Sequence, residues 1–319
     1  MSTRVLALSG GIGGAKLVLG LRAVLGAGDL TVAVNTADDF EHVGLHVSPD
    51  LDTVLYTLAG LNDPVRGWGR ADESWNFMGA LGSLGGETWF ALGDRDLAVH
   101  VERTRRLRAG ETLTSIMADM ASRLGVTVPI VPMTDDPVRT IVHTRTEGSL
   151  PFQDYFVRRR CAPAITEISY ADAGDARPSP AFAAAIADPE LRTIVVAPSN
   201  PWLSIDPILA IPGVRRALED ARVPIIAVSP IVQGQAVKGP TAKIMRELGM
   251  EPTSSAIARH YDGLIDGLVI DESDASDAEQ IGVPVRVTQT LMNDLDDRCR
   301  LAQAVLAFAE TLAGTATVG

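Results

Sequence analysis

Short apolar runs alternate with helical patterns toward both ends of the chain. The apolar runs lie at residues 5–8, 30–34, 193–197, 225–228 and 268–270. A helical pattern at 15–25 separates the first two runs, and others at 213–221, 240–248 and 254–263 accompany the later ones. Strands that alternate with helices in this way predict a mostly parallel sheet with helices on both faces.

The middle of the chain does not keep this rhythm. Residues 112–124 read as one amphipathic helix, while 141–144 and 156–159 read as short extended pieces that are less clearly parallel. We therefore expect a core built from residues 1–61 and 189–319, with a smaller subdomain or lid inserted over 62–188. Residues 301–312 predict an alanine-rich helix near the end of the chain.

Composition narrows the possible partners. The 319 residues include 40 acidic and 28 basic side chains, for a net charge of −12. Such a chain lacks the basic surface by which proteins bind nucleic acid or anionic membranes. No apolar run reaches the roughly 18 to 20 residues that span a bilayer. The two cysteines, Cys161 and Cys299, are too few for a disulfide scaffold, so we expect a cytoplasmic protein. Because the chain is acidic, an anionic substrate would have to be held by local groups such as backbone amides, a few cations or a metal ion.

A glycine-rich turn follows the first predicted strand. Its sequence, at residues 10–16, is GGIGGAK. Lys16 stands where the dinucleotide fingerprint needs its third glycine, and the P-loop pattern is also missing. Two interpretations stay open: a phosphate or nucleotide cradle of a non-standard kind, which the small residues and the helix N-terminus favour, or a tight turn without a ligand.

Four carboxylates lie within fifteen residues, and they would repel one another if they converged without a cation. They are Asp38, Asp39, Asp50 and Asp52. Hard oxygen ligands suit Mg²⁺, which usually takes one or two carboxylates and fills its other positions with water and phosphate. The alternative is that Asp38 caps a turn and Asp50 caps a helix.

Three further motifs contain residue types that bind phosphate or nucleotides. Residues 92–96, LGDRD, form either a surface ion pair or an arginine placed against a phosphate. Residues 199–201 and 229–230 follow predicted strands, so they should open at the same sheet edge as the glycine turn. His42 and His46 have a metal-ligand spacing, but the residues between them disfavour a helix and we expect no zinc site.

Taken in order along nearly the whole chain, these motifs resemble the CofD/FbiA family of 2-phospho-L-lactate or phosphoenolpyruvate transferases. The segments that carry the resemblance are 10–16, 35–39, 48–53, 92–96, 132–137, 152–154, 198–201 and 229–231. Residues 50–53, DLDT, and 92–96 together are specific, whereas the glycine turn alone is not.

The resemblance implies a reaction of coenzyme F-420 biosynthesis. A phospho-acid (lactyl, enolpyruvyl or glyceryl) linked to guanosine diphosphate meets Fo, which is 7,8-didemethyl-8-hydroxy-5-deazariboflavin. The ribityl hydroxyl attacks the distal phosphorus, GMP leaves, and a phosphodiester forms. The family also implies a Rossmann-like fold with a smaller second region, Mg²⁺ as the ion, and a homodimer. The sequence does not settle which phospho-acid is used.

The resemblance also implies roles for particular residues. Asp39 and Asp50 would hold Mg²⁺, and Asp52 would contact Fo and orient or deprotonate its hydroxyl. Arg95 would stabilise charge on the transferred phosphate, with Asp94 or Asp96 holding it. Ala91 stands where relatives often have lysine, so that a contact to Fo there would come from the backbone. The residues expected to hold the GMP moiety are Gly10, Gly11, Gly13, Gly14, Lys16, Ser199, Asn200, Pro201 and Ser229.

Two other functions stay open. One is a non-catalytic regulatory protein that binds a nucleotide or nucleotide-sugar on the same fold. The other is an NAD-dependent oxidoreductase, which Lys16 in the third glycine position disfavours.

Overall fold

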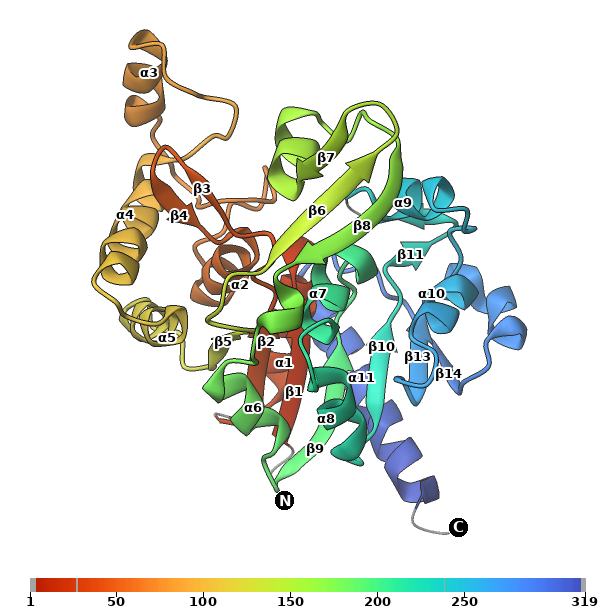
Figure 1. Cartoon of the computed structure of the whole chain (residues 1–319). Coiled ribbons are helices and arrows are strands. Elements are labelled where there is room, and N and C mark those ends of the chain that lie inside the picture. The colour runs from red at the N-terminus through yellow and green to blue at the C-terminus, as the bar shows by residue number, and fades with distance from the viewer. Residues whose placement is uncertain (1–3, 27, 238, 317–319) are drawn as a thin grey trace.

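The core of the protein is a seven-stranded sheet in which every pair of neighbouring strands is parallel. The computed structural model describes residues 4–26, 28–237 and 239–316. The strand order is β14-β13-β10-β9-β1-β2-β5, and helices flank the sheet (Figure 1). The strands are β1 (Arg4–Ser9), β2 (Leu30–Val34), β5 (Ile130–Pro132), β9 (Leu191–Val196), β10 (Ile225–Val228), β13 (Gly267–Ile270) and β14 (Val285–Val287).

Alternate side chains of the sheet enter two separate cores, as a pleated strand buried on both faces requires. In β1, Leu6 and Leu8 join one core while Val5 and Ala7 join the other. The second core includes side chains from α1 (Gly11–Val24), α2 (Pro49–Ala59), α5 (Leu113–Arg123) and α11 (Leu295–Ala316). The first includes side chains from α6 (Pro180–Ile186), α7 (Asp206–Leu209), α8 (Val214–Asp220), α9 (Thr241–Glu247) and α10 (Ser254–His260).

These observations confirm the predicted α/β class and the parallel sheet. The helical patterns at 15–25, 112–124, 213–221, 240–248 and 254–263 all correspond to helices, and the C-terminal helix begins earlier than expected, at Leu295. Among the helices of the described ranges, none is long and apolar enough to cross a membrane.

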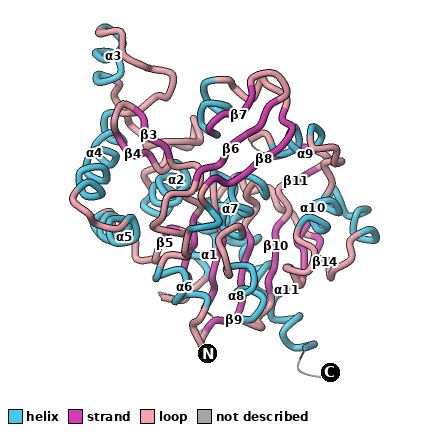
Figure 2. The backbone as a smooth tube through the Cα atoms, viewed as in Figure 1, coloured by secondary structure: helices cyan, strands magenta, loops and turns pink. Residues whose placement is uncertain are grey.

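The segment 62–188 is only partly separate from the core. Its strand β5 pairs with β2 as the edge strand of the main sheet. The rest includes α3 (Asn76–Ser83), α4 (Asp94–Arg108) and an antiparallel sheet in the order β7-β6-β8. That sheet consists of β6 (Arg139–Thr144), β7 (Gly148–Pro151) and β8 (Ile165–Ala171), and it lies above the carboxyl ends of the main strands (Figure 2).

The extended piece predicted at 156–159 is wrong. Asp154–Arg158 forms a π-helical turn, η1, in which the Arg159 amide donates to the Asp154 carbonyl at 2.8 Å. The turn buries Tyr155 and stacks Phe156 on Phe152, with ring centroids 5.2 Å apart. Residues 42 and 46 belong to the hairpin of β3 (Phe40–His42) and β4 (Leu45–Val47), which agrees with the expectation that they do not share a helix.

Short elements complete the chain. They are η2 (Ala173–Asp175), η3 (Pro201–Ile205), β11 (Ile231–Val232), β12 (Gln235–Ala236) and η4 (Glu272–Gln280).

Candidate active site

A cavity of about 710 Å³ opens at the carboxyl edge of the main sheet. Residues directly after β1, β9 and β10 line it, together with the start of α2 and parts of the segment 62–188. This is the position where open parallel α/β sheets bind ligands, because the loops from successive strands meet there. Of the residues predicted for the site, the cavity wall includes Gly10, Gly11, Gly13, Lys16, Asp50, Ala91, Ser199, Asn200 and Ser229.

The glycine turn at the start of α1 is packed tightly against its neighbours. A Cβ at Gly13 would lie 2.5 Å from the Pro198 carbonyl oxygen, and one at Gly10 would meet the carboxylate of Asp50. Gly11 has a φ of +61°, a left-handed conformation that glycine adopts without strain. The glycines therefore let the backbone of β1 and α1 approach the loop after β9 and the start of α2.

Polar side chains around the turn are held by hydrogen bonds. The Ser199 hydroxyl accepts from the Gly10 amide at 3.1 Å and donates to the Gly10 carbonyl at 2.7 Å. Lys16 Nζ donates to the Met292 carbonyl at 2.8 Å. The turn and the loop after β9 thus form one rigid wall of the cavity, and Gly14 packs behind it against Ser199.

Hydrogen bonds also hold the two loops at residues 199–201 and 229–230, which follow β9 and β10. Asn200 Oδ1 accepts from the Trp202 and Leu203 amides at 3.0 and 3.1 Å, so it caps η3, and its amide donates to Thr241 Oγ1 at 3.0 Å. Ser229 and Ser254 share a hydrogen bond of 2.9 Å. Pro201 begins η3 and is buried outside the cavity wall.

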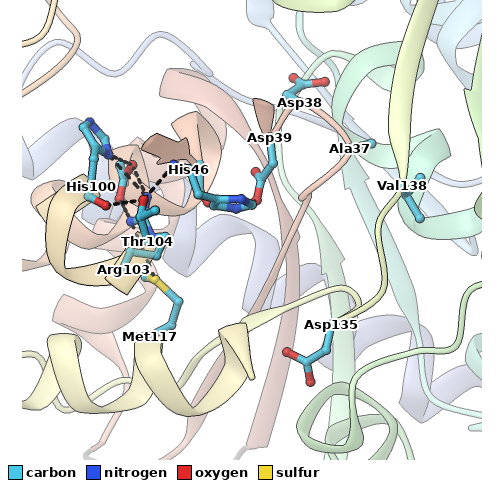
Figure 3. Close-up of polar contacts among 12 residues, drawn as sticks. Ala37, Asp38, Asp39, His46, His100, Arg103, Thr104, Met117, Asp135 and Val138 are labelled. Carbon is cyan, nitrogen blue, oxygen red and sulfur yellow. Dashed lines mark hydrogen bonds and ion pairs between the residues drawn. The ribbon is translucent and has the colours of Figure 1, made fainter. Parts of the chain in front are cut away.

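Of the four predicted carboxylates, Asp50 contacts the glycine turn, and Asp38 and Asp39 lie near Asp50. Asp50 Oδ1 accepts from the Gly11 amide at 2.8 Å, and its Oδ2 accepts from the Asn35 amide at 3.0 Å. Asp39 Oδ2 contacts His46 Nε2 at 3.0 Å and accepts from the Ser48 hydroxyl at 2.8 Å. Figure 3 shows the Asp39 carboxylate beside His46 and the Asp38 carboxylate pointing away from it.

These carboxylates are buried, and part of their hydrogen-bonding capacity is unused. Asp38 Oδ1 and Asp39 Oδ1 have no hydrogen-bond partner. Burial raises the pKa of Asp50 to about 6, and burial together with the nearby charge of Asp50 raises the pKa of Asp38 well above its usual range. Buried oxygens without partners and raised pKa values are properties of a group of carboxylates that a cation would stabilise.

We expected Asp52 to face the cavity, but its side chain is not part of the cavity wall. It lies in the first turn of α2, where it forms an ion pair with Arg103 of α4: Nη1 lies 3.1 Å from Oδ2, and Nη2 contacts Oδ1. Arg103 is fully buried, so its guanidinium requires a carboxylate at this place. Asp52 thus points to the far side of the helix, and its catalytic role stays a prediction.

The Asp52–Arg103 pair belongs to a buried network that also holds Asp96 and His100. Asp96 Oδ1 accepts from the Tyr56 hydroxyl at 2.5 Å, and His100 Nε2 lies 3.2 Å from that oxygen. Asp52, Asp96 and His100 are the one group in the described part of the chain with three metal-ligand atoms within 4.8 Å of one another. Arg103 already provides positive charge to this group.

The motif at 92–96 anchors a loop. Asp94 accepts from the Ser74 hydroxyl at 2.6 Å and from the Phe77 amide at 3.1 Å, and these hydrogen bonds lower its pKa. The Arg95 amide donates to Glu73 Oε2 at 2.7 Å, while its side chain is exposed and absent from the cavity wall among the residues described. The structure therefore places Ala91 at the cavity, but neither Asp94 nor Arg95.

Sequence reasoning missed the aromatic part of the wall. The segment 62–188 contributes five aromatic side chains to the cavity, namely Trp68, Trp89, Phe90, Phe152 and Phe156. Trp89 and Phe90 also pack on the hairpin of β3 and β4 through Phe40 and His42. Aromatic residues make up only 5% of the chain, so their concentration in this segment was the available signal.

The fold and the site define an α/β protein whose cavity joins a glycine turn and acidic groups to an aromatic wall. Comparisons with known proteins narrow this class. The family model described as "2-phospho-L-lactate transferase CofD" matches residues 5–304. The chain therefore belongs to the CofD family, which is a family of transferases.

Individual relatives agree with this assignment. The chain is 41% identical over 315 residues to a phosphoenolpyruvate transferase of Streptomyces coelicolor, covering 96% of this chain and 98% of that one. It is 36% identical to a phosphoenolpyruvate transferase of Mycolicibacterium smegmatis, with the same coverage. A UPF0052 family protein from Bacillus halodurans has the same fold, with a TM-score of 0.63, 17% identity and coverage of 96% and 99%.

Proposed function

We propose that the protein transfers a phospho-acid moiety from its GMP-activated diphosphate to the ribityl hydroxyl of Fo, with release of GMP and formation of coenzyme F-420-0 or its dehydro form. One observation carries the proposal: a single cavity presents a glycine turn, buried carboxylates and an aromatic wall to the same space. The relatives named phosphoenolpyruvate transferase support the enolpyruvyl group as the moiety transferred.

The nucleotide half of the donor belongs at the glycine turn. Gly13 and Lys16 lie on the cavity wall there, in the first two turns of α1, and the helix dipole favours negative charge at this end of the helix. The loops that carry Asn200 and Ser229 end on the same edge and would contact the base or ribose. Gly11 donates its amide to Asp50, so that a phosphate would be received by the amides further along the turn.

Mg²⁺ fits the carboxylates beside the turn. Asp39 and Asp50 would hold the ion as the family resemblance implies, and the buried Asp39 oxygen that has no hydrogen-bond partner supports this assignment. When bound, Mg²⁺ neutralises charge on the diphosphate and on the phosphorus that is attacked. Two carboxylates with water and phosphate are a usual ligand set for this ion.

Fo belongs against the aromatic wall. Its flat tricyclic ring offers a surface for Trp89, Phe90 or Phe152, and Ala91 lies in the same wall. This would leave the ribityl chain to extend toward Asp38 and Asp50. Transfer at phosphorus depends on alignment and charge neutralisation more than on covalent catalysis, so holding both substrates in one cavity supplies much of the required rate.

A carboxylate that lines the cavity is better placed than Asp52 to accept the hydroxyl proton. Asp38 lines the cavity, and burial raises its pKa, which makes its carboxylate a stronger base than an ordinary aspartate. Asp52 would then act through Arg103 and α4, which also carries Thr104, the residue that accepts a hydrogen bond from the His46 amide. Asp52 would thereby stabilise the packing of α2 against α4 and take no direct part in the transfer.

The setting we propose is a cytoplasmic homodimer. A GTP-derived donor is available in the cytoplasm, and the exposed side chains of Val65 and of Leu84, which follows α3, offer apolar surface to a second copy. Light scattering should then give about twice the 33.8 kDa of one chain; a mass of one chain would remove the dimer.

The reaction is tested by mixing the protein with Fo, GTP, Mg²⁺, a guanylyltransferase and each phospho-acid in turn, and reading the product by mass. We expect a phosphodiester of Fo, formed best with phosphoenolpyruvate. Binding of GMP with no product from any phospho-acid would instead support the alternative, a non-catalytic nucleotide-binding protein.

A further inference from the structure

Three consecutive arginines begin at the last residue of the π-helical turn, and they differ in what they contact. Arg158 Nη2 lies 2.9 Å from Glu87 Oε1, and its guanidinium also lies over the ring of Trp89. Arg159 Nε lies 3.2 Å from Glu147 Oε2. Arg160 lines the cavity, and its side chain has no hydrogen bond or ion pair with any residue that the structure describes.

The backbone holds Arg160 in an unusual conformation. Its φ is +51°, and Cys161 after it has a φ of +55°, so two successive residues other than glycine adopt the left-handed region. This region costs a residue with a side chain roughly 1 kcal/mol or more relative to the ordinary helical region. Glycine at position 160 would avoid that cost, so the requirements of the turn do not account for an arginine.

The charges of the cavity wall set Arg160 apart. Within the described ranges, the cationic side chains of the wall are Lys16, Arg66 and Arg160. Lys16 is at the glycine turn and donates to Met292. Arg66 pairs with Asp63 at 2.9 Å, donates to the Arg70 carbonyl at 2.7 Å and packs on two tryptophan rings. Among these three cations, Arg160 is thus the one whose guanidinium makes no hydrogen bond or ion pair with a described residue.

The donor has one more anionic group than the diphosphate. Lactyl, enolpyruvyl and glyceryl phosphates all carry a carboxylate. In the proposed function the glycine turn, Lys16 and Mg²⁺ bind the phosphates, so the carboxylate needs another partner. A guanidinium binds a carboxylate through two parallel hydrogen bonds, which fixes both distance and orientation. We propose that Arg160 binds the carboxylate of the transferred phospho-acid and thereby positions the phosphorus for attack; this inference rests on the proposed function.

The test compares four proteins in steady-state transfer to Fo: the wild type, Arg160→Gln, Arg160→Gly and the matched control Arg159→Gln. The donor is enolpyruvyl diphosphoguanosine, with GDP binding measured in parallel as a ligand that lacks the carboxylate. We expect both Arg160 variants to raise the KM for the donor by about 10- to 100-fold, as for a lost charged hydrogen bond. The affinity for GDP and the KM for Fo should change by less than about threefold, and Arg159→Gln should match the wild type.

Arg160→Gly separates binding from folding. Because glycine accepts a positive φ without strain, this variant should melt at or above the wild-type temperature while binding the donor poorly. A donor KM within threefold of wild type in both Arg160 variants would overturn the inference and leave the proposed function intact. Equal weakening of GDP and donor would also overturn it, because Arg160 would then contact the nucleotide. A wild type that forms no product with any donor would refute the proposed function, and the inference with it.

Discussion

The Arg103→Met variant should lose much of its stability, because it removes the positive charge from a buried network. Arg103 is fully buried, and Asp52 is only 5% exposed. Methionine replaces the aliphatic part of the side chain but leaves the Asp52 carboxylate without its counter-ion. Breaking a buried ion pair from one side costs about 3–5 kcal/mol, since the remaining charge stays desolvated.

This cost converts into a measurable change in melting temperature. With an unfolding entropy of about 2.1 cal/mol/K per residue, a chain of 319 residues loses roughly 1.5 °C for each kcal/mol. Arg103→Met should therefore melt about 4–8 °C below the wild type in differential scanning calorimetry. The control is Arg105→Met on the same helix, where the side chain is 63% exposed and its pair with Glu102 is screened by solvent. The control should melt within about 1 °C of the wild type.

The companion variant Asp52→Asn decides between a structural and a catalytic role for Asp52. The geometry predicts a lower melting temperature with most of the turnover retained, because Asp52 contacts Arg103 and not the cavity. A general base would show the reverse: turnover lower by roughly 10²–10⁴ and a normal melting temperature. Arg103→Met melting as the control does would refute the reasoning about the network.

Two further predictions concern the glycine turn and the carboxylates. Gly13→Ala should lower the affinity for GDP by at least tenfold and destabilise the fold by about 1–3 kcal/mol, because its Cβ would lie 2.5 Å from the Pro198 carbonyl oxygen. The control is Gly79→Ala, which has open space around the new Cβ. GDP binding by Gly13→Ala that is unchanged in calorimetry would contradict this prediction. Without Mg²⁺, the free energy of unfolding should fall by an amount on the order of 3 kcal/mol as the pH rises from about 4 to 6. The reason is that Asp50 has a pKa of about 6 in the folded protein, which therefore keeps a proton that the unfolded chain releases at lower pH. Denaturant titrations at pH 5 and 7.5 should then show that Mg²⁺ stabilises the protein more at pH 7.5, and equal stabilisation at both values would contradict a metal bound by these carboxylates.

The sheet could be predicted from the sequence wherever a strand is buried on both faces. β1, β9, β10 and β13 are short continuous apolar runs, and each is buried over most of its length. β14 is the opposite case: Val285–Val287 lies at the edge with two of three residues exposed, so its sequence contains no comparable apolar run. The sequence places β5 within the predicted insertion, because a strand of three residues between helical or irregular segments does not indicate which strand it pairs with.

The site was predictable where residues follow strands directly, and less so where distant segments meet. The glycine turn, Ser199 and Ser229 reach the cavity because parallel strands end at one edge. The first turn of α2 directs Asp50 and Asp52 to different sides, and the partner of Asp52 is Arg103, which lies 51 residues later in the chain. A single sequence does not show that pairing. Nor does it show Arg160, whose relation to the cavity depends on a π-helical turn.

The central claim is that one cavity joins a guanosine diphosphate-linked donor to Fo. The most direct measurement is the stoichiometry of a single incubation with purified donor, Fo and Mg²⁺, with GMP and the Fo phosphodiester quantified together by liquid chromatography and mass spectrometry. The account predicts equal amounts of GMP and phosphodiester, with neither formed when Fo is left out. Release of GMP without the phosphodiester, or no consumption of Fo at all, would contradict it.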